Sequence, residues 1–89
     1  MSTFPETLEF TYAKEMKKDI EKLFHDAKSV AIDLRESNRA SLACIQLLLA
    51  AKNKAKKDNI PIVIQTSDAL STIITELGLE EILEDKERT

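Results

Sequence analysis

The chain contains 89 residues, of which 43% are hydrophobic and 33% are charged, and its formal net charge is −3. A chain of this length forms one domain with a thin core, which leaves little room for a deep active site. The balance of acidic and basic residues excludes the strongly basic surface of a nucleic-acid-binding protein, and no apolar run approaches the roughly 18 residues of a membrane span. We therefore expect a single domain over residues 1–89, with residues 84–89 as a charged and frayed C-terminal tail.

The first elements predicted are a weak strand and a helix. Phe4, Leu8 and Phe10 alternate with other residues, but Pro5 lacks an N–H donor and restricts any strand at this point to the edge of a sheet. Thr11 is a candidate N-cap for the helix that follows. The apolar positions of this helix are spaced three and four residues apart, as on one helix face, and they are Met16, Ile20, Leu23, Phe24 and Ala27.

A strand, a turn and a long helix are predicted next. Residues 30–34 carry large apolar side chains on one face and Ala31 on the other, which is typical of a strand with both faces at least partly covered. The polar residues 35–39 predict a turn. Ser41 is a good N-cap for the long helix, and Asn59 can adopt the left-handed conformation that ends it.

The last elements are a strand and a third helix. Residues 60–65 are uncharged and rich in β-branched side chains, so we expect a central strand. Ser67 is predicted to cap the third helix and Gly78 to end it. Because the two strands and the long helix between them form a βαβ unit with a right-handed crossover, the sequence predicts an α/β fold with a small mixed sheet and helices packed on it.

The long helix offers more apolar surface than one sheet needs. Gln46 is the only polar residue in residues 42–51, whereas a helix lying on a sheet requires an apolar stripe about 100° wide. Either this helix is covered on several sides by its own chain, or its first turns bind another protein. We favour the second interpretation.

No group of residues predicts catalysis. His25 is the only histidine, and a surface position explains it better than a role as base or ligand. Cys44 is the only cysteine, which excludes an intrachain disulfide and a cysteine-cluster metal site and agrees with a reducing compartment. Gly78 is the only glycine, so the chain has no glycine-rich loop for phosphates. We expect a cytoplasmic protein that is not an enzyme and holds neither a cofactor nor a metal ion.

The strand end Ala31-Ile32-Asp33-Leu34 and the helix segment Gln46-Leu47-Leu48-Leu49-Ala50-Ala51 resemble those of a STAS domain, the fold of bacterial anti-sigma factor antagonists and of sulfate-transporter tails. The resemblance spans nearly the whole chain and depends on the ungapped order of motifs that are individually weak. The opening segment, residues 4–11, and the sequence Cys44-Ile45-Gln46 look most similar to the short STAS proteins encoded among bacterial chemotaxis genes.

The chain departs from this family at one important place. The antagonists carry an Asp-Ser-Ser-Gly type sequence at the start of the long helix, and a partner kinase phosphorylates the first serine. Counting from Asp33, the corresponding residues here are Ser41, Leu42, Ala43 and Cys44, so the acceptor position holds a leucine. We therefore expect no phosphorylation switch. Ser41 and Ser37 are weak alternative acceptors, because a cap and a turn already explain these serines.

The resemblance implies that the turn before the long helix and the first turns of that helix contact a protein partner. The predicted partner-binding residues are Arg39, Ala40, Ser41, Leu42, Ala43, Cys44, Gln46 and Leu47. The small residues would let a partner backbone approach closely, the two leucines would be apolar anchors, and Arg39 would supply a charge at the rim.

The function expected is that of a protein-interaction module in a bacterial signalling system, of the chemotaxis or anti-sigma type. Its partner would be a chemotaxis component, an anti-sigma factor or a kinase-like protein, and neither nucleic acid nor direct membrane insertion is expected. Three alternatives stay open. The chain could be the STAS subunit of a larger complex such as a lipid-trafficking transporter, or a small sensor of phosphate ligands, or the predicted surface could be core or a homodimer face.

Overall fold

A computed structural model of the chain describes residues 4–83. The elements, in order, are β1 (Thr7–Leu8), the 3-10 turn η1 (Phe10–Tyr12), α1 (Ala13–Phe24), β2 (Val30–Leu34), β3 (Arg39–Ala40), α2 (Leu42–Lys57), β4 (Ile62–Thr66), α3 (Asp68–Glu76) and the 3-10 turn η2 (Glu80–Ile82). The predicted C-terminal tail, residues 84–89, lies outside the described residues.

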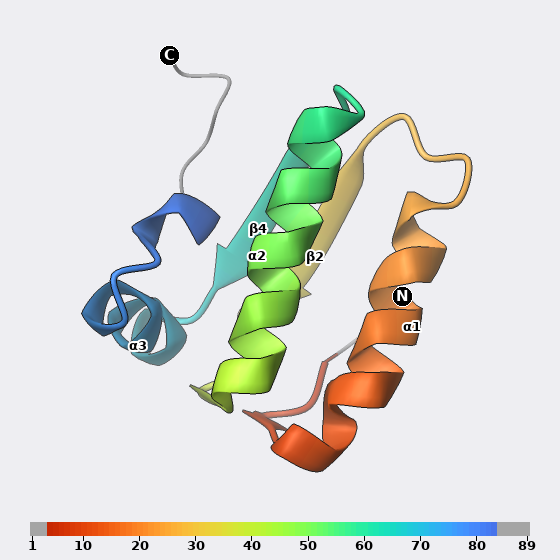
Figure 1. Cartoon of the computed structure of the whole chain (residues 1–89). Coiled ribbons are helices and arrows are strands. Elements are labelled where there is room, and N and C mark those ends of the chain that lie inside the picture. The colour runs from red at the N-terminus through yellow and green to blue at the C-terminus, as the bar shows by residue number, and fades with distance from the viewer. Residues whose placement is uncertain (1–3, 84–89) are drawn as a thin grey trace.

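The strands form two parallel pairs. β2 and β4 are joined by α2 and run side by side, from Val30 opposite Ile62 to Leu34 opposite Thr66 (Figure 1). β1 pairs in parallel with β3. The predicted α/β fold with a βαβ crossover is thus confirmed. In place of the single mixed sheet predicted, the described strands form two short sheets, both of them parallel. Figure 1 shows α1 and α2 side by side over one face of the β2–β4 pair.

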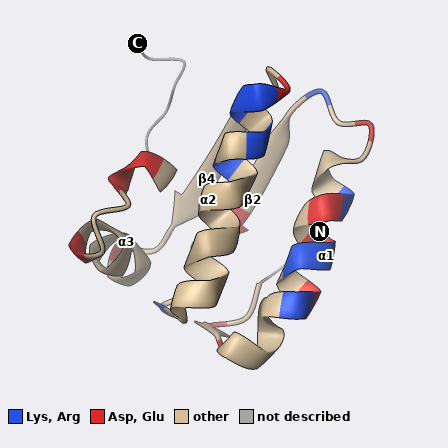
Figure 2. Cartoon of the chain, in the orientation of Figure 1, with Lys and Arg blue, Asp and Glu red and all other residues tan. Residues whose placement is uncertain are grey.

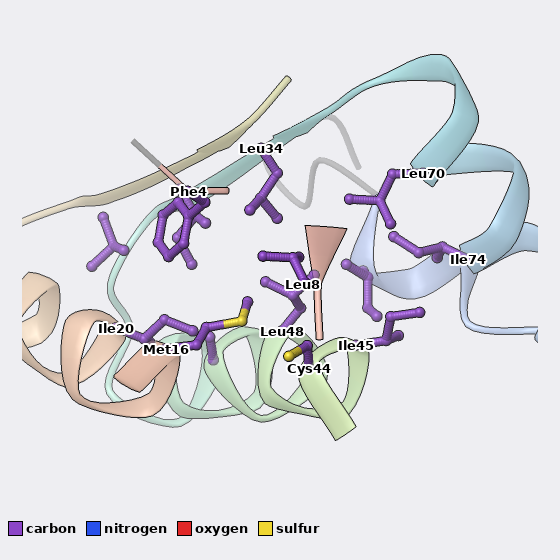
Figure 3. Close-up of a cluster of buried hydrophobic side chains, with 14 of the residues drawn as sticks. Phe4, Leu8, Met16, Ile20, Leu34, Cys44, Ile45, Leu48, Leu70 and Ile74 are labelled. Carbon is purple, nitrogen blue, oxygen red and sulfur yellow. The ribbon is translucent and has the colours of Figure 1, made fainter. Parts of the chain in front are cut away.

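The core lies between this pair and the two helices. Leu34, Leu48 and Leu8 are completely buried, and the Leu8 side chain reaches from β1 into the space between β2 and α2 (Figure 3). Met16 of α1 and Ile74 of α3 close the two sides of the cluster. Apolar side chains from every layer therefore meet in one cluster, as expected for a domain of this size.

The opposite face of the β2–β4 pair is open, which corrects two predictions. Ala31 is exposed, so β2 is covered on one face only, and Val63 in β4 is 52% exposed. Among residues 4–83, β4 pairs with β2 alone, so in this part of the chain it is at the edge and not the central strand that the sequence predicts. The reason is that the helices α1 and α2 both pack on the same face, and residues 4–83 supply no second layer.

The predicted helix and strand ends are mostly confirmed. The Ser41 hydroxyl accepts a hydrogen bond from the Cys44 N–H at 3.3 Å, and Ser67 caps α3 in the same way at 3.0 Å. Asn59 (φ 57°) and Gly78 (φ 75°) adopt the left-handed conformation after α2 and α3. Since only glycine takes this conformation without steric cost, Gly78 suits its position.

Two boundaries differ from the predictions. Thr11 does not cap α1, because it lies inside η1 and the helix begins after Tyr12 without a side-chain cap. β4 begins at Ile62 and not at residue 60, because Pro61 has no N–H to donate. The carbonyl of Pro61 still accepts a hydrogen bond from the Val30 N–H at 2.9 Å.

A buried serine joins three distant segments of the fold. The Ser37 side chain is completely buried, and its hydroxyl donates to the Pro5 carbonyl at 2.7 Å. The carbonyl of Ser37 accepts from the Ser67 hydroxyl, also at 2.7 Å, and its N–H donates to the Leu34 carbonyl at 3.0 Å. Ser37 therefore ties the segment before β1 to the end of β2 and to the start of α3, a role that the sequence did not predict.

Replacing Ser37 by alanine should lower the free energy of unfolding by about 1 kcal/mol, because the hydrogen bond from the buried Ser37 hydroxyl to the Pro5 carbonyl is lost. Urea denaturation followed by circular dichroism measures this loss. Ser29→Ala, at an exposed position, is the control and should change the free energy by about 0.5 kcal/mol or less. Equal stability of the two variants would contradict the role assigned to Ser37.

Candidate partner-binding surface

The start of α2 is held in place by β1. The N–H of Ser41 donates to the Leu8 carbonyl at 2.8 Å, and the pairing of β1 with β3 fixes Arg39 and Ala40 immediately before the helix. The Ser41 side chain then satisfies one of the free N–H groups at the helix start. The predicted contact region is thus an ordered part of the fold.

The predicted contact residues of α2 differ in exposure. Leu42 is 53% exposed, and Gln46, one turn further along the same stripe, is also exposed. Ala43 and Leu47 form the neighbouring stripe and are half-buried. Arg39 is exposed before them. These residues form a continuous surface at the start of α2.

Most of the surplus apolar surface of α2 is covered by the chain itself. The helix packs against α1, η1 and η2 as well as against the sheet, and Ile45 and Leu48 are completely buried. The first interpretation, coverage by the chain itself, is therefore correct for most of this helix, and partner binding stays a prediction for the part that is left exposed. The part left uncovered is Leu42 and Ala50, together with portions of Ala43, Leu47 and Leu49.

Cys44 does not belong to this surface, which corrects its prediction as a contact residue. Its side chain is completely buried, and the thiol donates a hydrogen bond to the Glu9 carbonyl at 3.4 Å. Helix geometry is the reason, because Cys44 is one residue beyond Ala43 and points towards β1 instead of towards solvent. The weak alternative acceptor Ser37 is likewise buried, with its hydroxyl engaged, whereas Ser41 is half-buried.

Phe10 is an exposed aromatic residue that the sequence did not reveal. It is 74% exposed, the largest exposed fraction among the exposed large hydrophobic residues. It follows Glu9, whose carbonyl accepts a hydrogen bond from the Cys44 thiol. The turn η1, to which Phe10 belongs, packs against α2 (Figure 1). Phe10 shares the alternation of Phe4 and Leu8, so the pattern indicated an inward side chain. The turn η1 breaks that alternation and leaves Phe10 on the surface near the start of α2.

An apolar groove runs between α1 and α2. Its lining includes Ile20 and Phe24 of α1 and Leu47 and Ala50 of α2, so it continues the half-buried stripe of the contact surface. Lys54 stands at its far end, with the ammonium group 5.6 Å from the centre of the Phe24 ring. A partner segment that contacts Leu47 would therefore also have access to this groove.

Charge is distributed unevenly along α2. Figure 2 shows no acidic or basic residue on its first turns, whereas lysines gather towards its C-terminal end. This arrangement complements the helix dipole at the lysine end and leaves the other end apolar. Among residues 4–83 no group of three or more His, Cys, Asp or Glu side chains is placed to hold a metal ion.

An exposed ion pair joins the end of β2 to the turn that precedes the surface. Arg35 Nη2 lies 2.9 Å from Asp33 Oδ2, and Arg35 Nε donates to Asp33 Oδ1 at 3.0 Å. These hydrogen bonds lower the pKa of Asp33 to about 2, with a further contribution from the backbone N–H of Arg35. They also raise the pKa of Arg35. Arg35 is thereby occupied by its neighbour, and Arg39 is the arginine that faces outwards next to α2.

The architecture defines a small α/β module with an ordered, apolar helix start at its surface. A search of the sequence against models of known families finds a match over residues 6–84 to the family described as Mlab, STAS domain. The chain therefore belongs to the STAS domain family. No curated protein matches it. STAS domains are generally non-catalytic modules that interact with proteins. None of the helices in residues 4–83 is long and apolar enough to cross a membrane.

Replacing Arg35 by alanine should raise the pKa of Asp33 from about 2 towards its ordinary value of 3.8, because the donors that stabilise the carboxylate are lost. A pH titration of the Asp33 carboxyl carbon by NMR measures the change. Since the pKa of Asp33 is lower in the folded protein, the stability contributed by the pair is present above pH 4 and is lost as the pH falls towards 2. Arg39→Ala should leave this titration unchanged.

Proposed function

We propose that the chain is a non-catalytic interaction module of a bacterial signalling system, located in the cytoplasm, which binds a protein partner through the start of α2. The observation that carries this proposal is the exposure of Leu42 (53%) and Phe10 (74%) on neighbouring elements. Large apolar side chains exposed on elements that pack together are typical of interaction sites. Membership of the STAS family supports a protein-binding role in general.

The residues around Leu42 suit a protein partner. Ala40 and Ala43 are small and half-buried, so a partner backbone can approach the helix closely. Covering the exposed part of one leucine contributes about 1 kcal/mol to binding, and an aromatic residue contributes more. Gln46 and Arg39 lie at the edge, where polar groups keep contact with water.

The proposed module binds without a phosphorylation switch. Leu42 stands at the position where the anti-sigma factor antagonists that the chain resembles carry the phosphorylated serine. A leucine side chain has no hydroxyl to accept a phosphate. In place of a group that gains charge and repels a partner, the helix start carries an apolar anchor. Occupancy of the surface is then governed by the concentrations of the module and of its competing partners.

Replacing Leu42 or Phe10 by aspartate should weaken partner binding at least about tenfold, because each change removes apolar contact and buries a charge. The wild-type chain first captures its partner from native lysate, mass spectrometry identifies that partner, and calorimetry with the purified pair measures the affinity. Leu77→Asp is the matched control, since Leu77 is 47% exposed and lies at the end of α3. If Leu77→Asp weakened partner binding while Leu42→Asp and Phe10→Asp left the affinity unchanged, the proposed surface would be contradicted.

The same capture separates the competing functions. A signalling partner should exchange with the free module, whereas a subunit of a larger complex, such as a lipid-trafficking transporter, should copurify stably with an ATPase. A sensor of phosphate ligands would instead show amide chemical-shift changes confined to residues 38–44 on titration with nucleotides. The exposed Arg39 is the one basic residue within this segment, so this third function is the least supported.

A further inference from the structure

The groove between α1 and α2 combines an apolar floor with positive charge. Ile20 of α1 and Leu47 and Ala50 of α2 are among the apolar residues that line it. Lys17 of α1 and Lys54 of α2 line it as well, and both are exposed. Figure 2 shows basic residues on both of these helices. The groove therefore suits a ligand that is apolar in one part and negatively charged in another.

The two lysines lie at opposite ends of the groove. The Lys54 ammonium group is 5.6 Å from the centre of the Phe24 ring, which lines the groove at the C-terminal end of α1. Lys17 precedes Phe24 by seven residues, and a helix rises about 10.5 Å over seven residues. A ligand that meets both ammonium groups therefore needs two negative charges that are about two helical turns apart.

The space between the lysines holds one large apolar side chain. The groove has a volume of about 140 Å³. An apolar cavity of about 150 Å³ holds one benzene molecule, so the groove accepts a side chain of the size of leucine or phenylalanine. The ligand that fits therefore offers one apolar group between its two charges.

We propose that the protein partner enters this groove with an amphipathic helix, which places one leucine or phenylalanine between two acidic residues. Residues i, i+3 and i+7 lie on one face of a helix, and residues i and i+7 are about 10.5 Å apart. Acidic residues at i and i+7 thus reach Lys17 and Lys54, and the apolar residue at i+3 enters the groove. Residues on one face of a strand are about 6.7 or 13 Å apart, which matches the two lysines less well.

The groove continues the partner surface proposed above, because Leu47 belongs to both. Amphipathic helices commonly bind other proteins by laying their apolar face into a hydrophobic groove. The acidic helix is a more specific form of the proposed function and rests on it.

Two acidic residues also lie near the lysines. Glu21 lines the groove on α1, so the groove carries two positive charges and one negative charge. Asp58 Oδ2 lies 3.3 Å from Lys54 Nζ, but both side chains are exposed, and a pair of this kind contributes little. A carboxylate of the partner can therefore compete for Lys54, and the groove as a whole still favours a negative ligand.

A synthetic helical peptide tests this chemistry without the natural partner. It has about 20 residues, mostly alanine, because shorter peptides hold little helix in water. Its centre carries a glutamate, a phenylalanine three residues later and a second glutamate four residues after that. The control peptide has lysines in place of both glutamates. Because one buried side chain and two exposed ion pairs supply the binding, we expect a dissociation constant of roughly 1 mM.

Amide chemical shifts of the chain measure the binding of the peptide. During titration to about 5 mM peptide the amides of Leu47 and Ala50 should shift, and the lysine peptide should bind at least about threefold more weakly. Lys17→Glu should raise the dissociation constant at least about threefold. Lys22→Glu is the matched control, since Lys22 is exposed on α1 and does not line the groove, and it should change the constant less than about twofold. Glu21→Gln should lower the constant, because a like charge is removed.

Filling the groove tests its apolar part. Ala50→Phe places an aromatic ring where the peptide side chain would lie, so the peptide should no longer cause the shifts. Ala69→Phe, on α3, is the control and should leave peptide binding unchanged. Both alanines are exposed, so both variants should fold, as circular dichroism checks.

Four results would overturn the proposal. Three of them are the absence of shifts in the groove, equal binding of the two peptides, and unchanged peptide binding by Ala50→Phe. The fourth is a shift of the same amides when the concentration of the chain alone rises, because a second copy of the chain would then occupy the groove.

The captured partner separates this proposal from the proposed function. If Leu42→Asp weakens partner binding and Ala50→Phe does not, the helix-binding groove is wrong and the proposed surface stands. If the peptide binds in the groove but neither Leu42→Asp nor Phe10→Asp weakens partner binding, the proposed surface is wrong and the affinity of the groove for an acidic helix stands.

Discussion

The hydrogen bonds of one buried serine fix the relative positions of three segments of the fold. Ser37 donates its hydroxyl to Pro5 and accepts the hydroxyl of Ser67, so it holds the first strand and the third helix at the end of β2. The position of β1 in turn fixes the start of α2, because the Leu8 carbonyl accepts the N–H of Ser41. The hydrogen bonds of Ser37 therefore help to place the start of α2, where the proposed partner surface lies. Such polar contacts matter in a domain of this size because its apolar core is small.

Local signals in the sequence were sufficient for much of this structure. The caps at Ser41 and Ser67 and the left-handed residues Asn59 and Gly78 depend on neighbours within a few positions, and each was predicted correctly. The strand at residues 30–34 was also correct, since its alternation directly reports burial on one face. The family resemblance and the α/β order were likewise available from the sequence.

The features missed depend on contacts between distant residues. The burial of Cys44 requires β1, and the role of Ser37 requires Pro5, neither of which lies near in the chain. The sequence predicts a central position for β4 because β-branched side chains suit a central strand and an edge strand alike. Whether a strand lies at an edge depends on how many strands the rest of the chain supplies. Phe10 was missed because a 3-10 turn interrupts an alternation that otherwise continues. The exposure of the start of α2 was thus predicted in part, without Phe10 and with Cys44 wrongly included, and its role as a binding surface stays a prediction.

The burial of the single thiol has a consequence for handling and for measurement. A cysteine that is completely enclosed and bonded to the Glu9 carbonyl is shielded from oxidants and from alkylating reagents as long as β1 stays in place. Its rate of alkylation then reports how often the amino-terminal strand lifts from the helix start. The chain carries a built-in probe of that opening, with no second thiol to confuse the signal.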